Sequence, residues 1–309
     1  MYIMLNNICT HLLTLFALNE DRPVLTREIS DDLSSVRVYK VKRSVIMARG
    51  LGTRMRQQDA GSTLSNEQTT AADAGVKGMI PTGRPFLDYV ISALADAGIT
   101  DVCLVIGPEH TLVREYYSAE GRLARVRVHF AIQQLPLGTA NAVAAAESFA
   151  GDDVVLVLNS DNYYPVESLR AIAELGASGL VGFERRALIA LGNMPAERVQ
   201  AFALCERGAD SRLESMIEKP DDATFARMAT SSLVSMNLWS FTPVIFEACR
   251  RVQRSERGEL ELQDAVTIAR HELGEPFIVV PFSGGVLDLS TRGDVATVAQ
   301  RLIGVTVSL

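Results

Sequence analysis

The stretch SVIMARGLGTRMR, residues 44–56, constrains the fold more than any other part of the chain. Its first apolar residues, Val45–Ala48, predict a short strand buried inside a parallel sheet. Gly50 and Gly52 follow, and glycine lets a backbone turn sharply enough for its N–H groups to approach an anion. A helix after the turn would add the positive end of its dipole, and the arginines at 54 and 56 would grip phosphate oxygens. The stretch therefore predicts a phosphate-binding turn between a strand and a helix.

Two common phosphate-binding loops do not match this turn. A dinucleotide-binding G-x-G-x-x-G loop needs glycine where the chain has Met55. A Walker A loop needs Gly-Lys-Ser/Thr where the chain has Met55, Arg56 and Gln57. The remaining pattern is G-x-G-T-R, and a glycine-rich turn without any ligand stays open as the alternative.

Composition narrows the classes of partner. The chain has 309 residues, of which 48% are hydrophobic and 22% charged, so it can bury a large core. A formal net charge of −7 argues against a nucleic acid or an anionic membrane as partner. The 4 cysteines and 4 histidines are scattered without the spacing of a metal site, which predicts reduced thiols in a cytoplasmic protein.

From Val45 onward, strand patterns alternate with helical patterns, which predicts an α/β fold with a parallel sheet covered on both faces. Further strands are expected at residues 101–107, 125–133, 153–158, 199–206, 212–218, 233–241, 277–281 and 286–289. Helices are expected at residues 85–97, 109–117, 138–149, 242–254, 262–273 and 292–302.

Two segments do not follow this alternation. The fairly apolar stretch Met1–Leu18 is too short and too polar for a membrane span, and residues 1–42 are interpreted as an N-terminal extension of unknown role, preceding a domain over residues 43–309. Within the extension, Val36–Lys42 alternates in the manner of an edge strand. Residues 57–75 are polar and form either a flap over the turn or a solvated insertion, and the second reading is favoured.

Several polar residues stand where open α/β sheets bind ligands, at or near the ends of strands. Asp161 follows the apolar run of residues 153–158, and Asp288 interrupts the run Gly285–Leu289. A buried ionised aspartate is costly unless it is paired or binds a metal, and Mg²⁺ prefers carboxylate oxygens. The alternatives are a turn-forming Asp161 and an Asp288 that caps a helix or lies on an edge strand. Lys77 and the E-K-P segment at 218–220 suit a phosphate ester, and each is also typical of a solvated surface.

Taken in order, these motifs resemble those of the sugar-phosphate nucleotidyltransferases, the family of glucose-1-phosphate thymidylyl- and uridylyltransferases. The resemblance runs from about Val45 to Leu302 and rests on G-L-G-T-R at 50–54, K-x-x-x-P at 77–81, G-R-P at 83–85, P-L-G-T-A at 136–140, N-S-D-N at 159–162, E-K-P at 218–220 and G-E-L-E-L-Q-D-A at 258–265. It implies a Rossmann-like three-layer sandwich with a mainly parallel mixed central sheet, of the nucleotide-diphospho-sugar transferase type. It also implies that a nucleoside triphosphate and a sugar 1-phosphate react, with Mg²⁺ as cofactor, to give an NDP-sugar and pyrophosphate.

The resemblance assigns roles residue by residue. The implied catalytic residues are Arg54, Lys77 and Asp161, and the implied metal ligands are Asp161 and Asp288. The implied nucleotide-binding residues are Ala48, Gly50, Leu51, Gly52, Thr53, Gln133, Gly138 and Thr139. The implied sugar-phosphate-binding residues are Asn162, Glu218, Lys219 and Asn237. The Gln133 amide can offer both a donor and an acceptor to a pyrimidine edge, which favours UTP or dTTP over GTP.

The chain also departs from the family pattern. Arg49 replaces a small residue before the first glycine, which adds positive charge near a triphosphate and can crowd the base. The interval from Arg54 to Lys77 is long, Ser160 replaces glycine, and Gln263 replaces threonine.

Two other functions stay open. One is a catalytically inactive regulatory paralogue that binds a nucleotide sugar. The other is a glycosyltransferase with an NDP-sugar donor, although its usual D-x-D motif is here Asn159-Ser160-Asp161. The sequence is compatible with a homo-oligomer and does not fix the oligomeric state.

Overall fold

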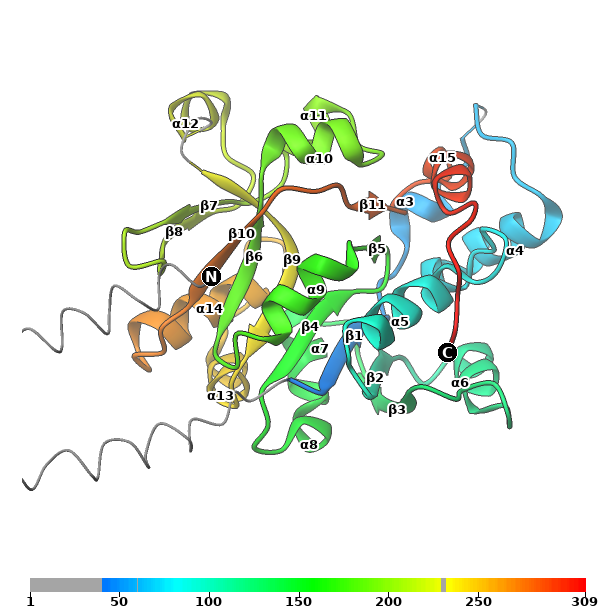
Figure 1. Ribbon diagram of the computed structural model, residues 1–309, viewed down its shortest axis with the longest axis horizontal. Helices are drawn as coiled ribbons and strands as arrows, with labels where there is room; N and C mark the ends of the chain where they lie inside the picture. The colour runs from blue at the N-terminus through cyan, green and yellow to red at the C-terminus, as the bar shows by residue number, and fades with distance from the viewer. Residues whose placement is uncertain (1–40, 60, 229–231) are drawn as a thin grey trace, which may run out of the picture. The chain divides into compact units, whose positions relative to one another are not determined.

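A nine-stranded mixed sheet runs through the residues that the structure describes, which are 41–59, 61–228 and 232–309 (Figure 1). The strands of this computed structural model are β1 (Arg43–Met47), β2 (Asp101–Ile106), β3 (Arg127–Ile132), β4 (Val155–Asn159), β5 (Asn162–Tyr163), β6 (Gly179–Phe183), β7 (Leu204–Arg207), β8 (Leu213–Ile217), β9 (Leu233–Phe241), β10 (Ile278–Phe282) and β11 (Leu287–Asp288). The main order is β10-β6-β9-β4-β1-β2-β3, with β7 pairing β8 and β9, while β5 and β11 form a separate small sheet.

Most of the central sheet is parallel. Strand β1 lies between β2 and β4 and is parallel to both, with Val45 opposite Cys103 and Val157. Only β9, among the described strands of the main path, runs antiparallel to its neighbours β4 and β6. The continuous apolar runs of β1, β2 and β4 fit this arrangement, because parallel strands are buried on both faces.

Helices cover both faces of the sheet (Figure 1). They are α3 (Thr53–Arg56), α4 (Asn66–Ala74), the 3₁₀ turn η2 (Lys77–Met79), α5 (Phe86–Asp96), α6 (Thr111–Ser118), α7 (Thr139–Ala145), α8 (Glu147–Ala150), α9 (Val166–Ala173), α10 (Arg185–Leu191), α11 (Ala196–Gln200), α12 (Asp222–Met228), α13 (Val244–Arg251), α14 (Leu262–His271) and α15 (Asp294–Arg301). Successive strand residues face opposite layers: Ile46 packs in one core with α5 and α9, and Val45 packs in another with α7, α13 and α14. This confirms the predicted α/β fold with three layers.

Several elements differ from the sequence prediction, and helices α9, α10 and α12 were not predicted. Residues 57–75 contain helix α4, which begins at a capping box in which Ser65 and Gln68 bond each other's backbone. The strand expected over 199–206 begins only at Leu204, because α11 occupies residues 196–200. Strand β6 was not predicted at all. The edge strand expected over residues 36–42 lies mostly outside the described residues, as does the N-terminal extension.

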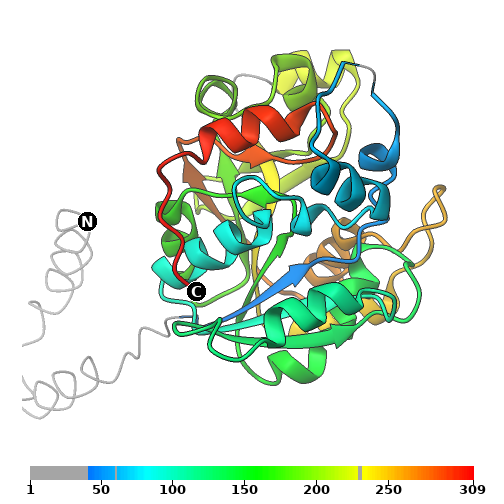
Figure 2. The same cartoon turned by 90° about the vertical axis from the view of Figure 1, so that its right-hand side faces the viewer.

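The C-terminal part of the fold returns to the glycine turn. Figure 2 shows the start of α15, in red, beside the blue segment that carries α3 and α4. Arg292, just before α15, is buried; its Nε donates to the main-chain oxygen of Met55 at 2.9 Å, and it forms an ion pair with Asp73. Helices α3 and α4 are therefore fixed by a residue that lies 237 positions after Met55 in the chain.

Candidate active site

The carboxyl ends of β1, β3 and β4 meet at a cavity of about 320 Å³. Turns that follow parallel strands collect at one edge of the sheet, where α/β folds bind ligands. Among the predicted residues, the lining includes Ala48, Gly50, Leu51, Thr53, Lys77, Gln133, Gly138, Thr139 and Asp161. The structure therefore brings together most of the predicted nucleotide-binding residues with two of the predicted catalytic residues.

Gly52 shapes the turn after β1. It caps α3 in the left-handed conformation, with φ of 60°, and a Cβ there would lie 2.5 Å from the main-chain oxygen of Gly75. Both the conformation and the space therefore require glycine. Arg54 on α3 is exposed, and no ion pair within the described part of the chain uses it, so its guanidinium is free to meet a phosphate.

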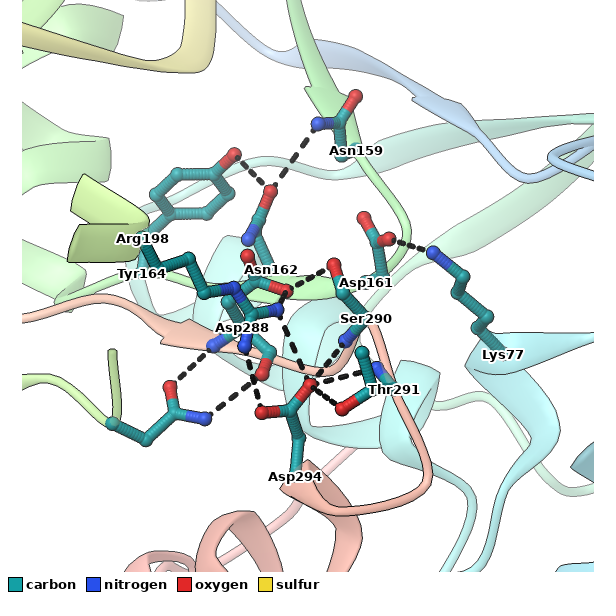
Figure 3. Close-up of polar contacts among 11 residues, drawn as sticks. Lys77, Asn159, Asp161, Asn162, Tyr164, Arg198, Asp288, Ser290, Thr291 and Asp294 are labelled. Carbon is teal, nitrogen blue, oxygen red and sulfur yellow. Dashed lines mark hydrogen bonds and ion pairs between the residues drawn. The ribbon is translucent and has the colours of Figure 1, made fainter. Parts of the chain in front are cut away.

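Lys77 and Asp161 form an ion pair inside the cavity. Lys77 Nζ lies 2.7 Å from Asp161 Oδ2, and each side chain is 19% exposed. Lys77 begins the η2 turn, and Asp161 follows β4. The fold thus joins a lysine and a carboxylate 84 positions apart at the end of the sheet, as Figure 3 shows.

Asp288 reaches the same place through the small sheet. Strand β11 pairs with β5 so that Asp288 lies opposite Asn162, and the N–H of Leu289 donates to the main-chain oxygen of Asp161 at 2.8 Å. The Asp288 side chain is buried, and burial, followed by the nearby Asp161 carboxylate, raises its pKa to about 6. The two predicted metal ligands therefore belong to neighbouring backbone segments and repel each other electrostatically.

A divalent cation fits this pair of carboxylates. Arg198 and Ser290 both donate to Asp288 Oδ1, at 3.0 and 2.5 Å. Lys77 donates to Asp161 Oδ2. These bonds do not use Asp288 Oδ2 or Asp161 Oδ1. Mg²⁺ commonly takes one or two carboxylates and completes its shell with phosphate oxygens and water. No cluster of three or more His, Cys, Asp and Glu side chains occurs among the described residues, so substrate and water would supply the other ligands.

The end of β3 forms another side of the cavity. Gln133 is buried, and its Nε2 donates to the main-chain oxygen of Gly138 and to Asn141 Oδ1, both at 3.0 Å. These bonds use both amide hydrogens, so the amide presents only Oε1 as an acceptor. The donor expected from Gln133 is therefore already engaged. Gly138 has φ of 120° and passes so close to Leu260 that a Cβ would lie 2.5 Å from its oxygen, while Thr139 Oγ1 accepts from the N–H of Leu262.

Arg49 extends from the turn toward β2 and β3. Its Nε and one terminal nitrogen each lie 3.3 Å from a carboxylate oxygen of Glu109, and its other terminal nitrogen donates to the main-chain oxygen of Gln133. The Arg49 side chain is only 7% exposed, whereas Glu109 is 53% exposed. Sequence reasoning predicted positive charge here, and the structure shows that this charge is already paired.

The predicted sugar-phosphate residues lie outside the set that lines the cavity. Lys219 and Asn237 have positive φ, 44° and 57°, a strained conformation that clusters at ligand sites. Burial raises the pKa of Glu218, and Arg257 lies 3.8 Å from its carboxylate. The buried Asn162 accepts a hydrogen bond from Asn159 through Oδ1, at 3.2 Å. Contacts of these four residues with a sugar phosphate stay a prediction.

Sequence reasoning missed the residues that hold Asp288. The Asn193 side chain makes two hydrogen bonds with the backbone of Asp288: it accepts from the N–H at 2.7 Å and donates to the carbonyl oxygen at 2.9 Å. Arg198 bonds the Asp288 carboxylate and also Asp294, at 2.7 Å (Figure 3). No local motif marks Asn193 or Arg198, because their partners lie at least 90 positions later.

The fold and the cavity define an α/β protein with a glycine turn, a lysine and two aspartates at the carboxyl edge of a mainly parallel sheet. The profile of the Nucleotidyl transferase family matches residues 43–277, and the chain belongs to this family. Among the described residues, no helix is long and apolar enough to cross a membrane.

Named relatives agree with this family. The chain is 27% identical to UTP–glucose-1-phosphate uridylyltransferase AglF of Haloferax volcanii, over 84% of this chain and 96% of that one. It is 30% identical to glucose-1-phosphate thymidylyltransferase of Streptomyces antibioticus over 72% of this chain, but the match spans only 56% of that relative, about half its length. A solved structure of UDP-glucose pyrophosphorylase complexed with UDP-glucose shares the fold, with a TM-score of 0.65 and 17% identity over 85% of this chain and 98% of that one.

Proposed function

We propose that this protein transfers a nucleotidyl group from a nucleoside triphosphate, UTP or dTTP, to a sugar 1-phosphate. A phosphate oxygen of the sugar 1-phosphate attacks the α-phosphorus, and a new P–O bond forms there. The bond from the α-phosphorus to the oxygen that bridges to the β-phosphorus breaks, so pyrophosphate leaves with that oxygen. The observation that carries the proposal is the Lys77–Asp161 pair, 2.7 Å apart, in one cavity with the glycine turn.

The side chains of the cavity suit this transfer, which needs positioning and charge compensation more than covalent chemistry. The amides of the turn and the exposed Arg54 would hold the β- and γ-phosphates. Lys77 would offset the negative charge that builds between the attacking and leaving oxygens. Mg²⁺, held by Asp161 and Asp288, would supply further neutralisation of the phosphates.

We assign the remaining predicted residues to the base and to the sugar of the substrates. Gln133 Oε1 would accept from the N3–H of uracil or thymine, since both hydrogens of its amide nitrogen are engaged. Lys219 and Asn162 would bind the sugar phosphate, and Glu218 and Asn237 would contact the sugar. The positive φ of Lys219 and Asn237 supports this assignment, because such strain persists where a defined side-chain placement is held by the fold.

A substrate panel tests the proposal. The purified chain with Mg²⁺ is incubated with each common nucleoside triphosphate and a set of hexose 1-phosphates, while pyrophosphate release and NDP-sugar formation are both measured. We expect both products with UTP or dTTP and none when EDTA removes the metal. NDP-sugar binding without turnover would instead indicate a regulatory paralogue. Sugar transfer from an NDP-sugar to an acceptor would indicate a glycosyltransferase.

A further inference from the structure

Arg49 is the arginine of the turn whose side chain is withdrawn from water and paired with a carboxylate. Its side chain is only 7% exposed, whereas Arg54 and Arg56 are exposed residues. The guanidinium meets the Glu109 carboxylate with two nitrogens, both at 3.3 Å, and donates to the main-chain oxygen of Gln133. A two-point contact of this kind fixes the orientation of the planar group.

These bonds tie together the ends of three neighbouring parallel strands. Arg49 follows β1, Glu109 follows β2, and Gln133 follows β3. Gly107 makes room for the contact, because a Cβ there would lie 2.3 Å from the Glu109 carboxylate oxygens. Arg49 and Gln133 both line the 320 Å³ cavity, so the guanidinium forms a wall of the space that holds the nucleotide.

The wall changes which hydrogen-bonding groups a base can find. Without Arg49, the Gln133 main-chain oxygen would be a free acceptor at the cavity, and the Glu109 carboxylate, which lines an adjoining hollow together with Arg49, would lose its partner beside it. Guanine presents two adjacent donor groups, N1–H and the N2 amino group, which suit such a pair of acceptors. Uracil and thymine present a single ring donor, N3–H, and the Gln133 Oε1 can accept it because both hydrogens of Nε2 are engaged.

We propose that Arg49 is a specificity-determining residue that excludes guanine nucleotides, by filling space at the base end of the cavity and by covering the acceptors that guanine would use. The inference rests on the proposed nucleotide site. Rejection of a ligand by hydrogen-bonding mismatch and by lost space commonly amounts to at least ~10-fold.

Binding measurements test this separately from catalysis. The affinities of UDP and GDP are measured by calorimetry for the full chain and for Arg49→Ala, with thermal unfolding to confirm that each variant is folded. We expect Arg49→Ala to raise the affinity for GDP relative to UDP by at least ~10-fold. The double variant Arg49→Ala/Glu109→Ala keeps the space but lacks the carboxylate, so its shift toward GDP should be smaller. Arg49→Lys, which keeps the charge without the planar fork, should lie between Arg49→Ala and the unaltered chain.

Arg43 provides a matched control at the opposite end of the same strand. It also bonds main-chain oxygens, of Phe149 at 2.7 Å and Ala150 at 3.0 Å, and it forms an ion pair with Asp153. Arg43→Ala should leave the ratio of GDP to UDP affinity unchanged. Equal weakening of both nucleotides in Arg49→Ala would show that Arg49 contacts the shared phosphates, and an unchanged ratio would overturn the inference. An unaltered chain that binds neither nucleotide would contradict the proposed function itself.

Discussion

The ion pair between Lys77 and Asp161 suits the phosphate ligand that we propose for the cavity. Each side chain is largely withdrawn from water, so each needs a partner of opposite charge until a ligand arrives. A triphosphate with a divalent cation offers both partners at once, an anion for the lysine and a cation for the carboxylate. The pair therefore holds both side chains in place without blocking the exchange.

Replacing either member of this pair should remove most of the turnover. We expect Asp161→Asn and Lys77→Ala each to lower the rate of pyrophosphate release at least ~100-fold, the scale of losing one preorganised electrostatic group. Matched controls are Lys42→Ala and Asp153→Asn, whose side chains are tied to Gly98 and to Arg43 away from the cavity lining. Near-normal turnover in either cavity variant would remove that residue from the mechanism.

The two glycines of the turn should differ sharply in their tolerance of a side chain. Gly52→Ala would force a Cβ into the left-handed region and against Gly75, so we expect a loss of about 1–3 kcal/mol in the free energy of unfolding. Gly50→Ala is the control, because a Cβ there has no atom within 4 Å. Urea unfolding of both variants measures the difference, and equal losses would contradict the strain argument.

At the scale of elements, helix α4 lies in a segment whose polar composition favoured a solvated insertion. We expect Ser65→Ala to destabilise it by ~1 kcal/mol, because Ser65 Oγ accepts from the N–H of Gln68 at 3.2 Å in the capping box. Hydrogen exchange of the α4 amides measures this loss. Thr70→Ala, in the interior of the same helix, should be neutral or slightly stabilising, since alanine is the better helix former. Unchanged protection in Ser65→Ala would show that tertiary packing alone holds α4.

The stability that the β2–β3 pair contributes to the fold should depend on pH through Asp101. Two hydrogen bonds from Arg127, at 2.8 and 2.7 Å, hold the pKa of Asp101 below its usual range. Thr100 and His129 also contact the carboxylate. A depressed pKa stabilises the fold at pH above the unfolded value of about 4, and this stabilisation is lost as the pH falls further.

Asp101→Asn should therefore lower the Tm more at about pH 7 than at about pH 3. Thermal unfolding of both proteins at the two pH values gives the comparison. Asp153→Asn is the control, because that carboxylate is 63% exposed and its ion pair is worth little. A difference in Tm that stays constant between the two pH values would rule out this role for Asp101.

The elements that sequence patterns predicted are those with one dominant local signal. Continuous apolar runs identified β1, β2 and β4, because such short runs fit strands that are buried between two helix layers. Residues 57–75 carried a capping box at Ser65 and Gln68, but their polar composition favoured a solvated insertion. Strand β6 contains Gly179 and Gly182, which weaken a strand pattern and are needed here because neighbouring strands crowd both positions.

At the scale of the whole molecule, the site depends on chain segments that no local pattern connects. The resemblance identified Asp161 and Asp288, but only the pairing of β5 with β11 places one beside the other. Arg198 and Asn193, which fix Asp288, come from a segment to which the sequence analysis gave no role. Motifs can name the residues of such a site, whereas the contacts that position them depend on how distant strands pair.

Ligand binding should protect backbone amides from exchange in two separable steps, because most of the predicted nucleotide residues line the cavity and the predicted sugar residues do not. With Mg²⁺ and UTP alone, we expect slower amide hydrogen exchange around residues 48–54, 75–78, 133–140 and 159–161, which surround the cavity. Adding a non-reactive sugar 1-phosphate analogue should extend protection to residues 217–219 and 237. The amides of α6 and α8 provide the internal reference.

The order of the two steps distinguishes this arrangement from its alternatives. A nucleotide held by the glycine turn contacts the ends of β1, β3 and β4 whether or not a sugar is present. Protection at 217–219 and 237 with UTP alone would place the triphosphate across both regions and contradict the assignment of Glu218, Lys219 and Asn237 to the sugar phosphate. Protection at neither region would mean that the Lys77–Asp161 pair does not exchange partners with a triphosphate, and that the edge of the sheet serves another ligand.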